Sequence, residues 1–337
     1  MVSMPNASAS SSRSVLIAGG AGYIGSHAAK ALAQAGWTPV VLDNLCTGDR
    51  AAARFGPFHE GSVADSKLVA ELVERYRPAG AMLFAGHAYV GESTQNPRKY
   101  FQNNVTDSLK FLDCLIDAGV RNVVFSSSCS VYGLPSVVPI SEANGYGPLS
   151  PYAETKAFFE RVLHWYGAAY GLRAATLRYF NAAGADPDGE LGESHEPETH
   201  LIPLVIQAAL GGAPIEVFGT DYPTPDGTAI RDYTHVTDLA DAHVRALTWM
   251  LEHDRSLTLN LGSGAGQSVR EVIVAVESAS GRPVPVRYGP RRTGDAPALV
   301  ADPAQARDLL GWTARHSSLS EIVLTAFGWT QSHQGPR

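Results

Sequence analysis

A tyrosine and a lysine lie four residues apart in the stretch SPYAETKAFFERV, as Tyr152 and Lys156. On a helix this spacing places both side chains on one face, with Cβ atoms about 5–6 Å apart. An ammonium group beside a phenol favours the phenolate and would draw the tyrosine pKa down from about 10 towards the working pH. The pair could therefore supply a general base, although such a pair on a surface helix is more often a solvated face.

Three serines end the apolar stretch NVVFSSS that precedes this pair. If the stretch is a strand of a parallel sheet, its last residues lie at the carboxyl edge, where ligands of such folds bind. Ser126, Ser127 or Ser128 could then reach a substrate close to the tyrosine and the lysine.

A glycine-rich turn opens the stretch GGAGYIGSHAAKAL, directly after the apolar run 15–18. The spacing of Gly19, Gly22 and Gly25 is typical of a turn whose backbone N–H groups meet a pyrophosphate at a helix start. Eighteen residues after Gly25, Asp43 ends the run TPVVLD, where a carboxylate can bind an adenosine ribose. A 2′-phosphate would be repelled there, so NAD is favoured over NADP; the alternative is an aspartate that only caps a turn.

These motifs require a sheet and helices to hold them. Short β-branched runs alternate with helix-like segments from residue 15 onward, which predicts parallel strands joined by helical crossovers. Helices are expected near 65–77, over 98–118 and over 151–170, the second with an apolar face. We therefore predict an α/β fold, a Rossmann-type doubly wound parallel sheet with a smaller α/β C-terminal substrate region. The expected division is a disordered tail over 1–13, an NAD-binding domain over 14–180, and a mainly substrate-binding region over 181–337 with some elements returning to the first sheet.

Composition excludes several other classes of protein. The net charge of −7 comes without a basic block, which argues against nucleic acid, and no apolar run approaches the length of a membrane span. Three cysteines without CxxC spacing indicate neither disulfides nor zinc and favour a cytoplasmic protein. The segment ESHEPETH contains His195 and His200 but is not HExxH, so no metal site is predicted.

Longer strings, taken in order, resemble the UDP-glucose (UDP-galactose) 4-epimerases of the extended short-chain dehydrogenase/reductase family. The resemblance runs from about residue 15 to 330, through GGAGYIGSH, VLDNLCTG, VGEST, FSSSCSVYG, SPYAETK, LRYFNAAGADPDGELGE, FGTDYPTPDGTAIRDYTHVTDLADAH and PRRTGD. It implies an NAD-dependent 4-epimerase that interconverts UDP-glucose and UDP-galactose through a transient 4-keto sugar. It also implies a homodimer, with the helices over 98–118 and 152–170 as the candidate interface.

The resemblance assigns roles to individual residues. Tyr152 would be the base, Lys156 its electrostatic and ribose-binding partner, and Ser128 the hydrogen-bond shuttle to the sugar. The implied cofactor contacts are Gly19, Gly22, Tyr23, Ile24, Gly25, Asp43, Asn44, Ser62, Val63, Phe84, Ala85, Gly86, Asn103, Ser126, Tyr152, Lys156 and Tyr179. The implied substrate contacts are Ser128, Tyr152, Asn181, His200, Leu201, Glu216, Val217, Phe218, Arg231, Tyr233, Arg292, Asp295 and Leu299. The two arginines suit a diphosphate, because a guanidinium forms paired hydrogen bonds to its oxygens.

Three positions depart from the family pattern or leave it open. Ser62 stands where such epimerases usually carry aspartate, and Ala88 where some carry lysine, so NAD retention is in question. Leu299 stands where residue size is thought to decide whether an N-acetyl group fits, which leaves UDP-pentoses and UDP-N-acetylhexosamines open as alternative substrates.

Two other functions remain as rivals. A sugar-nucleotide 4,6-dehydratase needs an added acid and base after the catalytic hydroxyl, but Cys129 and Ser130 occupy those places. A non-catalytic NAD-binding sensor on the same fold would not need the serine, tyrosine and lysine together.

Overall fold

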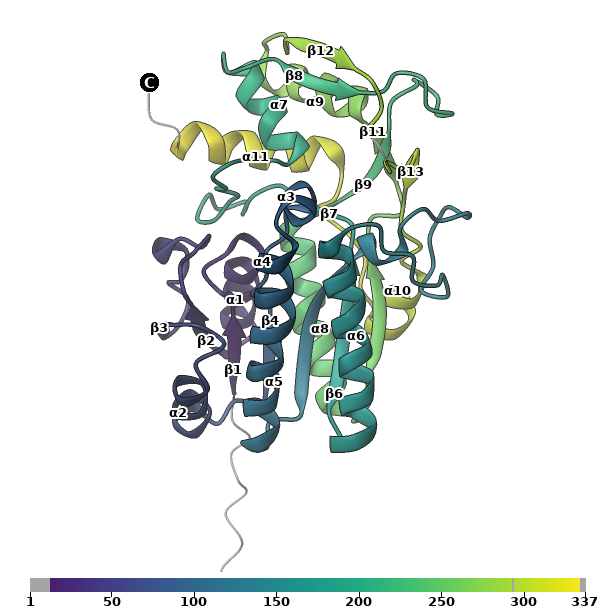
Figure 1. The fold of residues 1–337 in the computed structure, drawn as a ribbon. Helices are drawn as coiled ribbons and strands as arrows, with labels where there is room; N and C mark the ends of the chain where they lie inside the picture. Colours follow the sequence, from purple (N-terminus) through teal and green to yellow (C-terminus); the bar gives the residue numbers. More distant parts are fainter. Residues whose placement is uncertain (1–12, 293, 334–337) are drawn as a thin grey trace, which may run out of the picture.

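The central element of the fold is a parallel β-sheet. In the computed structural model, which describes residues 13–292 and 294–333, seven strands lie in the order β10-β6-β5-β4-β1-β2-β3 (Figure 1). Every neighbouring pair in this sheet is parallel. The strands are β1 (Ser14–Ala18), β2 (Thr38–Asp43), β3 (Phe58–Glu60), β4 (Gly80–Leu83), β5 (Asn122–Ser128), β6 (Arg173–Tyr179) and β10 (Leu257–Leu261). The predicted Rossmann-type doubly wound sheet is confirmed.

Helices cover both faces of this sheet, and the strands bury apolar side chains on each face because successive residues of a strand point to opposite sides. Val15 and Ile17 pack in a core with α1 and α8, whereas Leu16 and Ala18 pack in a second core with α2, α5 and α6. These helices are α1 (Tyr23–Gln34), α2 (Ser66–Tyr76), α5 (Ser108–Asp117), α6 (Pro151–Tyr170) and α8 (Val236–His253).

The segment predicted as one helix over 98–118 is an unbroken helical run whose hydrogen-bond pattern changes along its length. It begins as α4 (Pro97–Phe101), continues as a π-helical segment, η2 (Gln102–Asp107), and ends as α5. The predicted helix is therefore confirmed, but apolar spacing did not reveal the π-helical stretch inside it. Such turns are frequent at functional sites.

The remaining elements form a smaller region above the carboxyl ends of the large sheet (Figure 1). One sheet has the order β11-β9-β13 with β7 also paired to β9, and β12 pairs with β8. Helices α7, α9 and α11 supply residues of its own apolar core. The bounds are β7 (Asn181–Ala183), α7 (Leu201–Ala209), β8 (Ile215–Phe218), β9 (Ile230–His235), β11 (Gly266–Ser268), α9 (Val269–Ser280), β12 (Val286–Gly289), β13 (Ala298–Leu299) and α11 (Leu319–His333). The other short elements are η1 (Arg50–Ala52), α3 (Val90–Gln95), η3 (Cys129–Tyr132) and α10 (Ala304–Leu310).

The chain returns from the smaller region to the large sheet, since β10 pairs with β6 and α8 packs on the core that contains β1. Asn181, the first residue of the expected substrate region, begins β7 in the smaller sheet. The division at residues 180 and 181 stays a prediction. Of the predicted tail, only Arg13 lies within the described residues.

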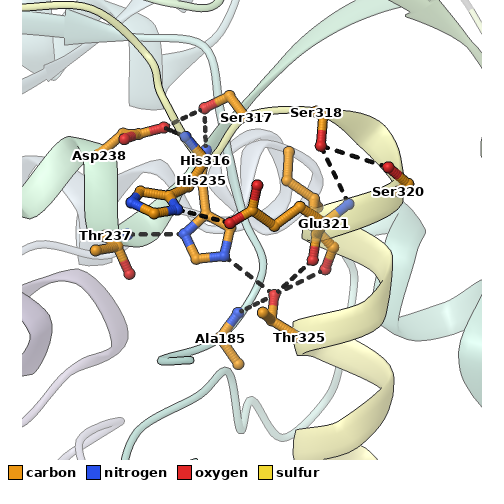
Figure 2. A network of polar contacts seen from close by, with 11 residues as sticks. Ala185, His235, Thr237, Asp238, His316, Ser317, Ser318, Ser320, Glu321 and Thr325 are labelled. Atoms are coloured by element: carbon orange, nitrogen blue, oxygen red, sulfur yellow. Dashed lines mark hydrogen bonds and ion pairs between the residues drawn. The ribbon is translucent and has the colours of Figure 1, made fainter. Parts of the chain in front are cut away.

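A polar network connects α11 and the segment before it to the start of α8 (Figure 2). The carboxylate of Asp238 accepts hydrogen bonds from the Ser317 hydroxyl at 2.7 Å and from the His316 backbone at 2.9 Å. The His235 ring accepts from the Thr237 backbone at 3.1 Å, and its other nitrogen lies 3.0 Å from the Thr325 hydroxyl. These contacts fix α11 against the strand β9 that leads into α8.

Candidate functional site

The glycine turn forms a close-fitting cradle at the start of α1. Gly19 has φ of +82°, and a Cβ there would lie 2.5 Å from the Ala85 backbone nitrogen. A Cβ on Gly25 would lie 2.1 Å from the Gly19 carbonyl oxygen. Gly22 caps the helix without a side-chain hydrogen bond, so the first helical N–H groups stay open to an anion. The turn therefore fits the pyrophosphate of a dinucleotide.

Asp43 lies at the carboxyl end of β2, next to this cradle. Its carboxylate is buried and accepts hydrogen bonds from the Ala21 backbone at 2.9 Å and the Leu45 backbone at 2.8 Å. Asp43 thus caps a turn in the structure, which was the alternative to ribose binding. A carboxylate has about four acceptor sites, so two remain for ribose hydroxyls.

Other predicted cofactor contacts surround the same edge of the sheet. The Tyr23 hydroxyl donates to the Gly184 carbonyl at 2.6 Å, and Ser62 accepts from the Ala64 backbone at 3.1 Å. Val63 is buried in the core that α2 covers. The remaining residues of this group follow β1, β2 or β4 in the chain and are Ile24, Asn44, Phe84, Ala85 and Gly86.

Asn104, which sequence reasoning missed, connects the cofactor edge to α6. It is buried in the π-helical segment and accepts from the His87 backbone and from Asn103, each at 2.9 Å. Its amide donates to Thr155 on α6 at 3.2 Å. Asn103, a predicted cofactor contact, is thereby held beside the helix of Tyr152. The one feature of the sequence that could have indicated Asn104 is that it adjoins Asn103.

The predicted catalytic residues come together at the ends of β5 and α6. Ser150 caps α6 by accepting from the Ala153 backbone at 3.2 Å, so Tyr152 lies in the first turn. Ser128 ends β5 and hydrogen-bonds to Tyr152. Lys156 follows one turn later, with its ammonium 5.8 Å from the Tyr152 ring centroid. All three side chains are buried.

Burial dominates the electrostatics of this group. It raises the pKa of Tyr152 to about 12, against a smaller lowering by the Ser128 hydrogen bond. Burial also lowers the pKa of Lys156 to about 8, against the raising effect of Glu160. In the protein alone the lysine therefore does not bring the tyrosine pKa below its usual value, because desolvation of the phenol outweighs the lowering effects. The further lowering expected from a positive nicotinamide ring stays a prediction. The Lys156 ammonium donates to the Ser126 carbonyl at 2.7 Å.

A buried ion pair supports the catalytic helix from behind. Glu160, one turn after Lys156, accepts from the Arg178 guanidinium at 3.0 and 3.1 Å and from the Ser127 hydroxyl. The hydroxyls of Ser126 and Tyr179, both predicted cofactor contacts, hydrogen-bond to each other. Sequence reasoning missed Glu160, although its helical spacing from Lys156 was a usable signal. The ion pair joins α6 to β6, and the hydrogen bond from Ser127 joins α6 to β5.

The smaller region contains a cavity of about 450 Å³. Most of the residues predicted to bind substrate line it: Asn181, His200, Leu201, Glu216, Val217, Phe218, Arg231, Tyr233, Arg292 and Asp295. Glu193 and Gln207 also line it and were missed. Ser128 and Tyr152 lie outside its lining, and Leu299 lies on β13, where it pairs in register with Arg231.

Two arginines give one wall of this cavity its charge. Arg231 lies 3.3 Å and Arg292 lies 3.2 Å from opposite oxygens of Asp295. Arg292 also stacks on Phe218, with its guanidinium 4.6 Å from the ring centroid. One carboxylate between two guanidiniums leaves a net positive charge, which suits a diphosphate.

The loop ESHEPETH, for which no metal was predicted, folds its charged groups together. His195 and His200 both hydrogen-bond through Nδ1 to one oxygen of Glu193. Burial raises the pKa of Glu193, but the two imidazole hydrogen bonds outweigh it and hold that pKa at about 2.

Comparison with known proteins places the chain in a family. The model of the NAD-dependent epimerase/dehydratase family matches residues 15–262. The chain belongs to this family. A UDP-glucose 4-epimerase of Rhizobium leguminosarum bv. trifolii is 48% identical over 316 residues, 94% of this chain and 96% of the relative. The resemblance seen in the sequence motifs is confirmed.

Solved structures of the family share the fold. The UDP-glucose 4-epimerase of Brucella ovis in complex with NAD is 51% identical and has a TM-score of 0.92, over 94% of this chain and 97% of that one. The Stenotrophomonas maltophila enzyme with bound NAD and formylated UDP-arabinopyranose is 40% identical, also with a TM-score of 0.92, over 95% and 98%. Within residues 13–292 and 294–333, no helix combines the length and the apolarity needed to span a bilayer.

Proposed function

We propose that the protein is an NAD-dependent UDP-glucose 4-epimerase, an isomerase that interconverts UDP-glucose and UDP-galactose through a transient 4-keto sugar. The observation that carries this proposal is the meeting of Ser128, Tyr152 and Lys156 at the carboxyl edge of the sheet. Ser128 pairs in register with Tyr179, two residues before Asn181, which lines the arginine-walled cavity. The catalytic group thus lies where the cofactor edge and the cavity adjoin.

Residues of the protein, rather than the cofactor, carry out the proton transfer. Tyr152 takes the proton of the sugar 4-hydroxyl onto its phenolate oxygen, and Ser128 relays hydrogen bonding between the two oxygens. Bound NAD supplies the hydride acceptor and donor and, when oxidised, a positively charged ring. Burial holds the pKa of Tyr152 at about 12 with Lys156 already in place, so the phenolate needs further positive charge. The oxidised nicotinamide ring would add this charge to that of Lys156, which hydrogen-bonds to Ser126.

The sugar must present both faces of C4 in turn. Strong contacts at the diphosphate combined with weak contacts at the hexose allow this rotation, and the paired arginines Arg231 and Arg292 supply the strong contacts. The remaining predicted substrate and cofactor contacts keep their roles as part of this proposal. A dehydratase is disfavoured because burial raises the pKa of Cys129 to about 12, which removes an acid or base after Ser128.

The proposal extends to a homodimer. Helix α6 exposes Phe158, Trp165 and Tyr170, with 43%, 68% and 54% of each residue accessible. Aromatic residues of this kind are typical anchors of interfaces. Light scattering of the purified protein should give twice the chain mass, and Trp165→Glu should shift it towards one chain. We place this enzyme in the cytoplasm and in galactose metabolism.

A panel of UDP-sugars tests the function. The purified protein is incubated with UDP-galactose, UDP-arabinose and UDP-N-acetylgalactosamine, and 4-epimers are resolved by chromatography. Formation of UDP-glucose as the fastest reaction supports the proposal. Faster conversion of the pentose or the N-acetylated sugar would reassign the substrate, and a 4-keto-6-deoxy product would indicate a dehydratase.

A further inference from the structure

The loop between β7 and α7 gathers four side chains that are good metal ligands. We propose that Glu193, His195, Glu198 and His200 form a binding site for a divalent transition-metal ion of the zinc class. The ligand atoms that these residues offer all lie within 4.8 Å of one another. The site shares His200, an expected substrate contact, and Glu193 with the lining of the cavity, but it contains none of the residues assigned to proton transfer. Metal binding is no part of the proposed epimerase reaction, so the inference goes beyond that function.

Two of the separations between the ligand atoms lie near those around a tetrahedral ion. Bonds of about 2.0–2.1 Å place neighbouring ligand atoms of tetrahedral zinc roughly 3.3 Å apart. His195 Nδ1 lies 2.9 Å from Glu193 Oε1, and His200 Nδ1 lies 3.6 Å from Glu198 Oε1. These two values lie on either side of the tetrahedral separation, whereas His200 Nδ1 and Glu193 Oε1 are in closer hydrogen-bond contact and would have to move apart when an ion binds. Small side-chain shifts would therefore open the space that an ion occupies.

The charge of the cluster also calls for a cation. The side chains of Glu193 and Glu198 are only 6% and 8% exposed. Among the residues that the structure describes, neither carboxylate forms an ion pair with a lysine or an arginine. Two buried carboxylates repel each other unless positive charge lies near them. Without a metal ion, the imidazoles of His195 and His200 supply this charge only when they are protonated. Two neutral imidazoles and two carboxylates balance a divalent ion.

A second acidic cluster in the same region shows the contrast. Asp186, Asp188 and Glu190 also offer converging carboxylates. There the ammonium of Lys30 lies 2.8 Å from an oxygen of each one. The chain thus supplies that cluster with its own cation, so it is not a candidate metal site.

Surrounding groups hold the proposed ligands in place. The His195 ring meets Tyr23 and Tyr89 edge-on, with centroids 6.3 and 5.9 Å apart. Glu198 Oε1 accepts from the backbone N–H groups of Thr199 and His200 at 2.7 and 2.8 Å. Contacts of this kind orient metal ligands and raise affinity.

Metal titration of the full-length protein tests the proposal. The protein is treated with EDTA, freed of chelator and titrated with ZnCl₂ by calorimetry; Co²⁺ binding is followed by its visible spectrum. We expect one equivalent of metal, with affinity at least tenfold lower in Glu193→Gln and in His195→Gln. His253→Gln, which changes an exposed histidine on α8, is the control and should match the wild type.

Two outcomes would overturn the proposal. One is a wild-type protein that binds no Zn²⁺ saturably, which would leave the cluster as a hydrogen-bonded network only. The other is equal affinity in the wild type and both cluster variants, whose folding is checked by circular dichroism. Since the readout is bound metal, this result is independent of the epimerase assay.

Discussion

Lys156 gives the pH dependence of stability a specific sign. Burial lowers its pKa from 10.5 to about 8 in the folded protein. Between these two values the unfolded chain binds more protons than the folded one, so the lysine's contribution to the free energy of unfolding increases as pH rises. We predict that replacing it by methionine, in Lys156→Met, removes this dependence.

The magnitude follows from the shift. At 1.36 kcal/mol per pKa unit, burying Lys156 costs about 3 kcal/mol at pH 7, where it is charged, and about 2 kcal/mol at pH 9, where it is mostly neutral. From pH 7 to pH 9, the free energy of unfolding of the wild type should therefore increase by roughly 1 kcal/mol relative to that of the Lys156→Met variant. The variant also loses the hydrogen bond to Ser126, which lowers its stability independently of the titration. The change in the stability difference between the two pH values, rather than its absolute size, is therefore the quantity to compare.

Urea-induced unfolding of the NAD-free protein at pH 7 and pH 9 measures this difference. The exposed Lys67, replaced in Lys67→Met, is the matched control and should show no comparable change. A wild-type advantage that stays constant or shrinks from pH 7 to pH 9 would refute the reasoning that burial controls the charge of Lys156.

Three further predictions concern binding and stability. Gly25→Ala should abolish NAD binding, measured by fluorescence titration, because its Cβ would lie 2.1 Å from the Gly19 carbonyl oxygen; retained affinity would contradict the cradle. Arg292→Ala should weaken UDP binding about tenfold in calorimetry, since one charge-assisted contact is lost; unchanged affinity would remove it from the diphosphate site. Asp238→Ala should lower the free energy of unfolding by about 2 kcal/mol, because Ser317 loses its buried acceptor; a loss under half of that would show the network in Figure 2 to be dispensable.

Local spacing allowed the sequence to predict much of the site. The glycine turn, Asp43 and the Tyr152–Lys156 pair each follow from contacts within a few turns or at one strand end. The geometry that each motif needs depends on residues close together in the chain. In the structure the glycine turn begins α1, Asp43 ends β2, and Tyr152 and Lys156 lie one turn apart on α6. The pKa of Tyr152 was not predictable in this way, because burial depends on what the rest of the chain packs around it.

Residues whose partners are distant in the chain could not be predicted from the sequence. Asn104 was hidden because a π-turn breaks the helical periodicity that predicted the segment. Glu160 owes its role to an ion pair with Arg178 on β6, a contact that the sequence around Glu160 does not indicate. The loop carrying Glu193 and His200 has no periodicity, so the convergence of its side chains could be seen only in the folded chain.

The most direct test of the account is the turnover of Tyr152→Phe with UDP-galactose. We predict a loss of about 10²-fold or more, the usual contribution of a general base, with NAD and UDP still bound. Tyr166→Phe removes a hydroxyl from the same helix, where it contacts Asp113, and should keep full turnover. Near-normal turnover by Tyr152→Phe would contradict the assignment of this phenol as the base.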